Sequence, residues 1–381
     1  MRNLYLDHAA SAPCDPRVLE AMRPYFNEQS GNASSPHRQG RYARKALEDS
    51  REIAAAFIGS APVEIVFTSG ASESNNHAIF STARALKAKG RHIVASAIEH
   101  HSILEPLRQL EQDGFQVTYV RPRTDGIIAF EEIKAVLRPD TVLVCLQHAN
   151  NEIGTIQPVS QVGRLCRELG IYFLVDATQT VGHIPVSVKE IQCDLLSFSA
   201  HKFYGPQGVG ALYIRQGIKC SAFILGGDQE RGRRAGTHNV TGIFGLGEAI
   251  KICRAQMTEE AVREIELRDM VIKSVLKDIP SAVLNGHPKE RLPNNAHFSF
   301  PGISGEELVS SLDMAGIAVS MGSACTWGQL EPSHVLKATG LSDGMALGSL
   351  RVSLGRATTK EDIAYFLEQL RLKCKNVSSN S

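Results

Sequence analysis

Short, continuously apolar runs alternate with helical patterns from about residue 16 to about residue 255. Seven runs have the length of a strand: 64–68, 92–95, 116–120, 142–146, 172–175, 195–198 and 210–214. Most of them lack the apolar–polar alternation of a strand with one face in water, which indicates strands that helices cover on both faces. Helical patterns such as 72–89 and 159–169 lie between them. This rhythm predicts an α/β domain with a mostly parallel sheet.

The pattern changes after about residue 258, where a charged helical run leads into a segment that mixes strands and helices. A chain of 381 residues also exceeds what one hydrophobic core usually supports. We therefore expect a large domain over 16–257 and a smaller α+β domain formed by 1–15 and 258–381.

A last amphipathic helix is predicted near the end of the chain. Thr358 and Glu361 have the spacing of a capping box, which marks a helix start. The apolar stripe of this helix consists of Ile363, Phe366, Leu367 and Leu370, and the pattern runs to Lys373.

Charge and cysteine content exclude several classes of protein. Lys and Arg number 41 against 40 Asp and Glu, so bulk electrostatics gives no reason to bind nucleic acid directly. No apolar run approaches the ~18 residues needed to cross a bilayer, and the N-terminus does not resemble a secretory signal, so we expect no membrane partner. The eight cysteines include no C-x-x-C pair, so we expect no metal site and a reduced, cytoplasmic chain.

Lys202 follows the apolar run 195–198 and precedes a loop rich in Gly and Pro. Ligands of open α/β sheets bind at the carboxyl ends of strands. A partly desolvated lysine there can lose its proton and attack a carbonyl group. A surface lysine in a turn is the alternative, but the Ser-Ala-His-Lys context and the neighbouring glycines favour the nucleophile.

Two other strand ends carry polar residues. Asp176 follows the run 172–175, and Gln179 stands three residues later. An aspartate in that place can keep the pyridinium nitrogen of a cofactor protonated, although a helix N-cap is an equal alternative. Ser72 lies in a small-residue turn that opens a helix, and the free N–H groups of such a turn can hold a phosphate. The turn is neither a Walker A loop nor a G-x-G-x-x-G fingerprint.

Together these stretches resemble the pyridoxal-phosphate enzymes of the class V aminotransferase group, which are fold type I transferases. The segment 319–333, Val-Ser-Met-Gly-Ser-Ala-Cys-Thr-Trp-Gly-Gln-Leu-Glu-Pro-Ser, looks like the catalytic loop of cysteine desulfurases of the bacterial iron–sulfur assembly type. Further motifs of that family stand in the same order at 6–10, 31–37, 150–154, 234–237 and 350–356. The resemblance covers almost the whole chain, which argues against a chance match.

The resemblance implies a site for pyridoxal 5'-phosphate. Lys202 is expected to carry the cofactor as a Schiff base, Asp176 to pair with the ring nitrogen, Gln179 to contact the phenolic oxygen and His100 to stack on the ring. Asn151 is a further cofactor contact. The residues expected to hold the phosphate are Ala71, Ser72, Ser199, His201 and Thr237. Thr237 is expected to act on the site of the partner subunit, which implies a homodimer with shared active sites.

The family's activity is the conversion of L-cysteine to L-alanine. The resemblance implies that Arg351 clamps the substrate carboxylate, with Asn151 also positioning the substrate and with Asn32 and Arg356 as lesser candidates. Lys202 is expected to remove the Cα proton, His100 to relay a proton to the substrate thiol, and Cys325 to take the sulfur as a persulfide for an acceptor protein. Iron–sulfur assembly, tRNA thiolation and DNA phosphorothioation all remain open as the destination.

Other interpretations remain. A selenocysteine lyase, a β-lyase or an aminotransferase would share the fold, although an aminotransferase does not need Cys325 in its Gly-Ser-Ala-Cys context. A partner-binding relative without activity is disfavoured by the joint presence of Lys202, Asp176, Gln179 and Cys325. Arg351 could instead pair with a structural carboxylate, and His100 could be a buried histidine at a helix start.

Overall fold

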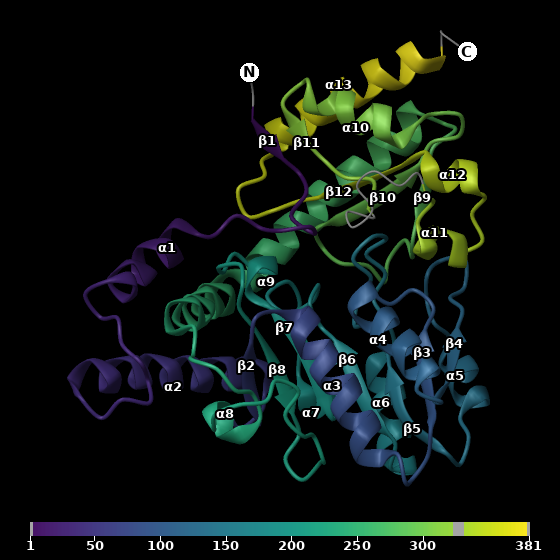
Figure 1. Cartoon of the computed structure of the whole chain (residues 1–381). Coiled ribbons are helices and arrows are strands. Elements are labelled where there is room, and N and C mark those ends of the chain that lie inside the picture. Colours follow the sequence, from purple (N-terminus) through teal and green to yellow (C-terminus); the bar gives the residue numbers. More distant parts are fainter. Residues whose placement is uncertain (1–2, 323–330, 379–381) are drawn as a thin grey trace.

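The computed structural model describes residues 3–322 and 331–378 (Figure 1). All seven predicted strands are present in this part of the chain, and they form one sheet in the order β2-β8-β7-β6-β5-β3-β4. Their bounds are β2 Ile65–Thr68, β3 His92–Ser96, β4 Gln116–Val120, β5 Thr141–Cys145, β6 Tyr172–Asp176, β7 Leu195–Ser199 and β8 Gly210–Ile214. The strands from β4 to β7 pair in parallel, whereas β8 runs antiparallel to β7 and β2. The prediction of a mostly parallel sheet is confirmed.

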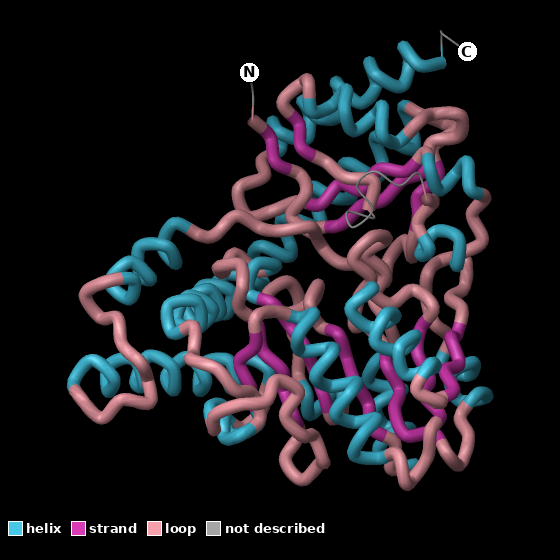
Figure 2. The backbone as a smooth tube through the Cα atoms, in the orientation of Figure 1, coloured by secondary structure: helices cyan, strands magenta, loops and turns pink. Residues whose placement is uncertain are grey.

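Helices cover both faces of this sheet, as the continuous apolar runs predict (Figure 2). On β5, Leu143 and Cys145 pack with helices α3 (Ala71–Leu86) and α4 (His101–Gln112). Val144, which points the other way, belongs to a core with α2 (Arg38–Ile58) and α6 (Val159–Leu169). Every residue of β5 is therefore buried. The remaining helical elements of this region are α1 Pro16–Met22, η1 Arg23–Phe26, η2 Pro62–Glu64, α5 Phe130–Val136, α7 Val188–Ile191, η3 Ala200–Lys202 and α8 Gln229–Gly232.

A separate apolar core lies in the upper part of Figure 1. Its antiparallel sheet has the order β12-β10-β9, and a two-stranded parallel ladder joins β1 to β11. The strands are β1 Leu4–Tyr5, β9 Val283–Asn285, β10 Asn295–Ser299, β11 Ile317–Ala318 and β12 Ser349–Ser353, and the helices are α10 Gly305–Asp313 and α13 Lys360–Ser378. Leu4 and Leu6 of the N-terminal segment belong to this core. Two short helices, α11 His334–Ala338 and α12 Asp343–Leu347, instead pack in the core of the large sheet through Val335, Leu336 and Ala346.

One helix of 39 residues, α9 (Val240–Asp278), connects the two cores. Its first half packs in the core of the large sheet through residues such as Leu246, and its second half packs in the other core through Leu267 and Val271. The charged run predicted after residue 258 is thus the second half of a continuous helix. The division at 257/258 stays a prediction, and it falls inside α9.

The start of α13 corrects one detail of the sequence analysis. The capping box is formed by Thr359 and Asp362, whose backbone N–H groups each bond the other's side chain at 3.0 and 3.1 Å. Thr358 instead accepts a bond from Gly355 N–H, and this turn shifts the helix start by one residue. Among the described helices, none is both long enough and apolar enough to cross a membrane.

Candidate active site

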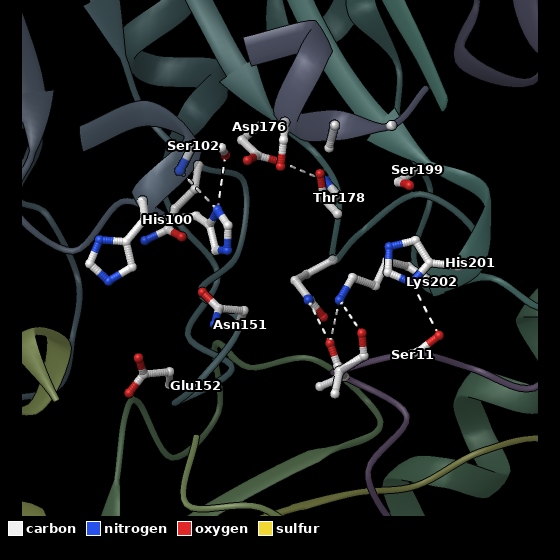
Figure 3. A pocket seen from close by; sticks show the side chains of 18 of the residues that line it. Ser11, His100, Ser102, Asn151, Glu152, Asp176, Thr178, Ser199, His201 and Lys202 are labelled. Atoms are coloured by element: carbon white, nitrogen blue, oxygen red, sulfur yellow. Dashed lines mark hydrogen bonds between the residues drawn. The ribbon is translucent and has the colours of Figure 1, made fainter. Parts of the chain in front are cut away.

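A cavity of about 560 Å³ lies at the carboxyl ends of β6 and β7, where the two cores meet. Ten of the residues predicted from the sequence line it: Ala71, Ser72, His100, Asn151, Asp176, Gln179, Ser199, His201, Lys202 and Arg351. Figure 3 shows His100, Asp176 and Lys202 approaching the same space from three different segments. Residues far apart in the sequence are therefore gathered in one site.

Lys202 ends the short helical turn η3, directly after β7. Its ammonium group donates hydrogen bonds to the backbone carbonyls of Ala9 at 2.7 Å and Ala10 at 2.6 Å. The backbone behind it is fixed, because His183 Nε2 lies 2.9 Å from the Lys202 carbonyl oxygen and that His is buried. Lys202 is thus a nucleophile candidate on a rigid support.

Asp176 ends β6 with its carboxylate held on both sides. Oδ1 accepts from the Thr178 N–H at 2.9 Å, and Oδ2 accepts from the Asn75 amide at 2.8 Å. Asn75 is fully buried on α3, and it also donates to the Ser102 hydroxyl at 2.9 Å. Asn75 is not among the site residues predicted from the sequence. Its one signal is its position on the apolar face of a helix that starts at the proposed phosphate site.

His100 is the N-cap of α4, and its Nδ1 accepts from the Ser102 N–H at 3.1 Å. Burial lowers the pKa of this imidazole below its ordinary value, and the nearby Lys202 lowers it further, while Asp176 opposes the shift. His100 is therefore neutral at pH 7, with its proton on Nε2 because Nδ1 is the acceptor. Both roles considered for His100, helix cap and cavity residue, are present together.

The turn from β2 into α3 offers a cradle for an anion. Gly70 has a φ of 153°, and a Cβ atom on Gly210 would come within 2.7 Å of the Gly70 Cα, so only glycines allow this close approach. The N-terminal turn of α3 presents N–H groups to the cavity beside Ser72 and Ser199. Burial and the adjacent Lys202 lower the pKa of His201 to about 4.

These residues fit pyridoxal phosphate. A phosphate matches the start of α3, the oriented carboxylate of Asp176 matches a protonated ring nitrogen, and Lys202 matches an aldehyde.

The opposite wall of the cavity comes from the smaller core and the segment 151–152. Glu152 is buried, and burial raises the pKa of its carboxyl group. Its Oε2 accepts from the Ser333 hydroxyl at 2.5 Å, and Ser333 also caps α11. A Cβ on Gly322, which has a φ of 103°, would lie 3.3 Å from the same Oε2. Glu152 thus contacts the chain on both sides of the segment 323–330.

Three predicted residues that the structure describes do not line this cavity. Thr237 lines a second cavity of about 190 Å³ that shares Ser69 and Gly208 with the first. Asn32 accepts from the Ser34 N–H in a local turn, and Arg356 bonds Asp15 and Glu260. Cys325 lies outside the described residues.

The family described as aminotransferase class-V matches residues 4–366. The chain belongs to the class V aminotransferase family. Within this enzyme family, it is 51% identical over 369 residues to a cysteine desulfurase IscS of Dictyoglomus turgidum, covering 97% of this chain and 94% of that protein.

Two solved structures of this family have a similar fold. One is titled "NIFS-LIKE PROTEIN", and it is 37% identical with a TM-score of 0.93 over 98% of this chain and 100% of that one. Another is titled "SspA in complex with cysteine", and it is 36% identical with a TM-score of 0.81 over 92% of this chain and 99% of that one. The fold type I architecture predicted from the motifs is confirmed by this likeness and by the mostly parallel sheet.

Proposed function

We propose that the protein is a pyridoxal-phosphate-dependent cysteine desulfurase, which converts L-cysteine to L-alanine and holds the sulfur as a persulfide on Cys325. The observation that carries this proposal is the meeting of Lys202, Asp176 and Arg351 in one cavity. Such a cavity holds a carbonyl-reactive amine, a carboxylate for a pyridinium nitrogen and a cation for an amino-acid carboxylate. The identity to a cysteine desulfurase over nearly the full length supports it.

Different residues of the chain are proposed to contact different groups of the cofactor. Lys202 is proposed to bind the aldehyde, Asp176 the ring nitrogen, Gln179 the phenolic oxygen, and Asn151 a further group. Ala71, Ser72, Ser199 and His201 are proposed to hold the phosphate, and His100 to lie against the ring. When bound, pyridoxal phosphate supplies an electron sink for the charge that develops at the substrate Cα.

The chain's own groups then move the protons and the sulfur. Arg351 holds the substrate carboxylate, and the amine of Lys202 takes the Cα proton. His100 carries a proton on Nε2, which suits a relay to and from the substrate thiol. The thiolate of Cys325 forms a bond to the substrate sulfur as the bond from that sulfur to Cβ breaks, and the electron pair left on the carbon side takes up a proton to give alanine.

Three further features belong to the proposal. Thr237, in the neighbouring cavity, is proposed to reach the phosphate of a second subunit in a homodimer. The persulfide is proposed to pass to a sulfur-acceptor protein, and the reaction to take place in the cytoplasm, where thiols stay reduced. The large domain 16–257 is proposed to carry the cofactor, with Cys325 and Arg351 on the smaller domain.

Mass spectrometry of Cys325 after exposure of the holoenzyme to L-cysteine tests the function. We expect a mass increase of one sulfur atom on this residue and release of alanine. Cys325→Ser is expected to bind the cofactor normally but to form no persulfide. Cys220→Ser is the matched control, because Cys220 is partly exposed and burial raises the pKa of its thiol to about 11. Sulfide release by Cys325→Ser at the parent rate would place the nucleophile elsewhere, and alanine production without any persulfide would favour a lyase.

A further inference from the structure

The N-terminal motif Leu6-Asp-His-Ala-Ala10 has no part in the reaction proposed above, yet it borders the cavity. Asp7 Oδ1 accepts a hydrogen bond from Arg351 Nη2 at 2.7 Å, across 344 positions of sequence. We infer that Asp7 is a positioning residue, which orients the Arg351 guanidinium for the carboxylate of an α-amino acid. The inference rests on the proposed function in that Arg351 is taken to bind the substrate carboxylate.

Arg351 is one of the largest fully buried side chains in the described part of the protein. A guanidinium has five N–H donors in one plane. Nη1 uses its two donors on the backbone carbonyls of Asn151 at 2.9 Å and Gly322 at 3.2 Å, and Nη2 uses one on Asp7. Nε is buried and has no hydrogen-bond partner among the residues that the structure describes.

A further acceptor for Nε would complete the hydrogen bonding of Arg351. A buried, charged N–H without an acceptor costs on the order of 1–3 kcal/mol, so native proteins rarely leave one. Asn151, Gly322 and Asp7 together use three of the five donors of the Arg351 guanidinium. Nε and the second donor of Nη2 remain, and Arg351 lines the cavity. Two donors match the two oxygens of one carboxylate. Nε is enclosed in this structure, so a substrate carboxylate can accept from these two donors only after a neighbouring group moves.

Asp7 is held firmly enough to orient its partner. Its backbone forms a parallel bridge to Ser353, which lies two residues from Arg351 on β12. Ser353 N–H donates to the Leu6 carbonyl at 2.8 Å, and the Ser353 hydroxyl accepts from the Ala9 N–H at 2.9 Å. The backbones that carry the carboxylate and the guanidinium are thus joined by one strand pairing.

The Asp7 carboxylate also balances the buried cation before the substrate arrives. A buried cation without a partner is costly, and two carbonyl dipoles replace a full negative charge only in part. Removal of Asp7 is expected to leave the guanidinium free to turn about its remaining carbonyl contacts. The resulting loss of affinity should affect recognition of the substrate carboxylate and should not affect recognition of its amine or its thiol.

Spectral titration of the holoenzyme with L-cysteine and with cysteamine tests this inference, because cysteamine is the same molecule without the carboxylate. Asp7→Ala is expected to raise the apparent Kd for L-cysteine about tenfold or more and to leave the Kd for cysteamine unchanged. The Kd of Asp7→Asn for L-cysteine is expected to lie between those of the parent and of Asp7→Ala, since the amide oxygen accepts the same bond without the charge. Asp113→Ala, at an exposed position after α4, is the control.

Equal weakening of both ligands, an unchanged Kd for L-cysteine or tighter binding of L-cysteine would each overturn the inference. The last outcome would mean that Asp7 competes with the substrate. If Asp7→Ala does not fold, the Asp7→Asn titration decides alone. Should the wild-type protein bind both ligands but form no alanine, the desulfurase proposal fails while the titration still judges the role of Asp7.

Discussion

Asn75 donates a hydrogen bond of 2.8 Å to Asp176, and in this way α3 orients the carboxylate at the end of β6. Asn75 is fully buried and satisfies two further groups, because it also donates to Ser102 and accepts from the Ser197 hydroxyl at 2.5 Å. A single amide thus connects the proposed ring-nitrogen partner, the hydrogen-bond neighbour of His100 and β7.

Asn75→Ala is expected to destabilise the protein by about 1–3 kcal/mol, since it leaves buried polar groups without partners. It should also weaken retention of pyridoxal phosphate, because Asp176 loses one of its two orienting bonds. Denaturant unfolding and the absorbance of the bound cofactor after dialysis measure the two effects. Asn76→Ala is the control, because Asn76 donates to the Ser72 carbonyl of its own helix. Equal effects at both positions would contradict the role of Asn75.

Two substitutions of His100 separate its role as the N-cap of α4 from its proposed role in proton transfer. His100→Asn is expected to keep the helix cap, because Asn is a favourable N-cap residue, whereas His100→Ala should lose about 1 kcal/mol of stability. Both variants are expected to lose turnover by roughly 10²–10⁴-fold, since neither carries an imidazole. Thermal unfolding and alanine production are the measurements. Normal turnover in His100→Asn would restrict His100 to its structural role.

The strands and the cavity could be predicted from the sequence because both depend on local pattern. A strand buried on both faces is largely apolar, as residues 142–145 of β5 are, and a polar group at its carboxyl end then stands out, as Asp176 does. Lys202 follows the same logic after β7.

Interactions between distant segments could not be predicted in that way. The contact of Asp7 with Arg351 depends on the pairing of the N-terminal segment with β12, and no periodicity indicates that pairing. Asn75 looks like an ordinary polar residue of a helix until α3 is placed across the sheet. The capping box moved by one residue because Thr358 is used in the preceding turn, and local spacing alone cannot tell two adjacent threonines apart.

The buried carboxyl group of Glu264 leads us to expect that the stability of the protein depends on pH. Glu264 is buried on α9, and burial together with Glu260 raises the pKa of its carboxyl group to about 8, although Arg263 and Arg356 oppose the shift. The folded protein therefore holds a proton on Glu264 that the unfolded chain releases near its ordinary pKa of about 4.3. Because the folded state binds more protons, stability is full below that value and falls as the pH rises toward 8, by at most about 1.4 kcal/mol per pH unit.

Glu264→Gln is expected to remove this decline, so that the variant gains stability over the parent as the pH rises from 5 to 8. Denaturant unfolding at several pH values measures the slope. Glu266→Gln, at an exposed position on the same helix, should keep the parental slope. An identical slope in Glu264→Gln and the parent would show that Glu264 is ionised in the folded protein.

Arg51 and Glu230 form a buried ion pair that fixes the loop before Thr237. Two nitrogens of Arg51 contact the two carboxylate oxygens of Glu230 at 2.6 and 2.7 Å, and both side chains are almost fully buried. Glu230 also accepts from the Phe67 N–H at 2.9 Å, and it lies 2.9 Å from His238 Nε2. The pKa of Glu230 falls to about 2 because these bonds, the one to Arg51 first, outweigh burial, which raises it.

The loop itself is strained, since Glu230 and Arg231 both have positive φ values, 48° and 59°. Arg51→Met is expected to cost about 3–5 kcal/mol, because it leaves the Glu230 charge buried without its partner. Arg51→Met combined with Glu230→Gln should recover part of this loss, because no unpaired charge remains. Unfolding free energies of the two single variants and the double variant give the coupling. A double variant whose loss equals the sum of the single losses would show that the two side chains act independently.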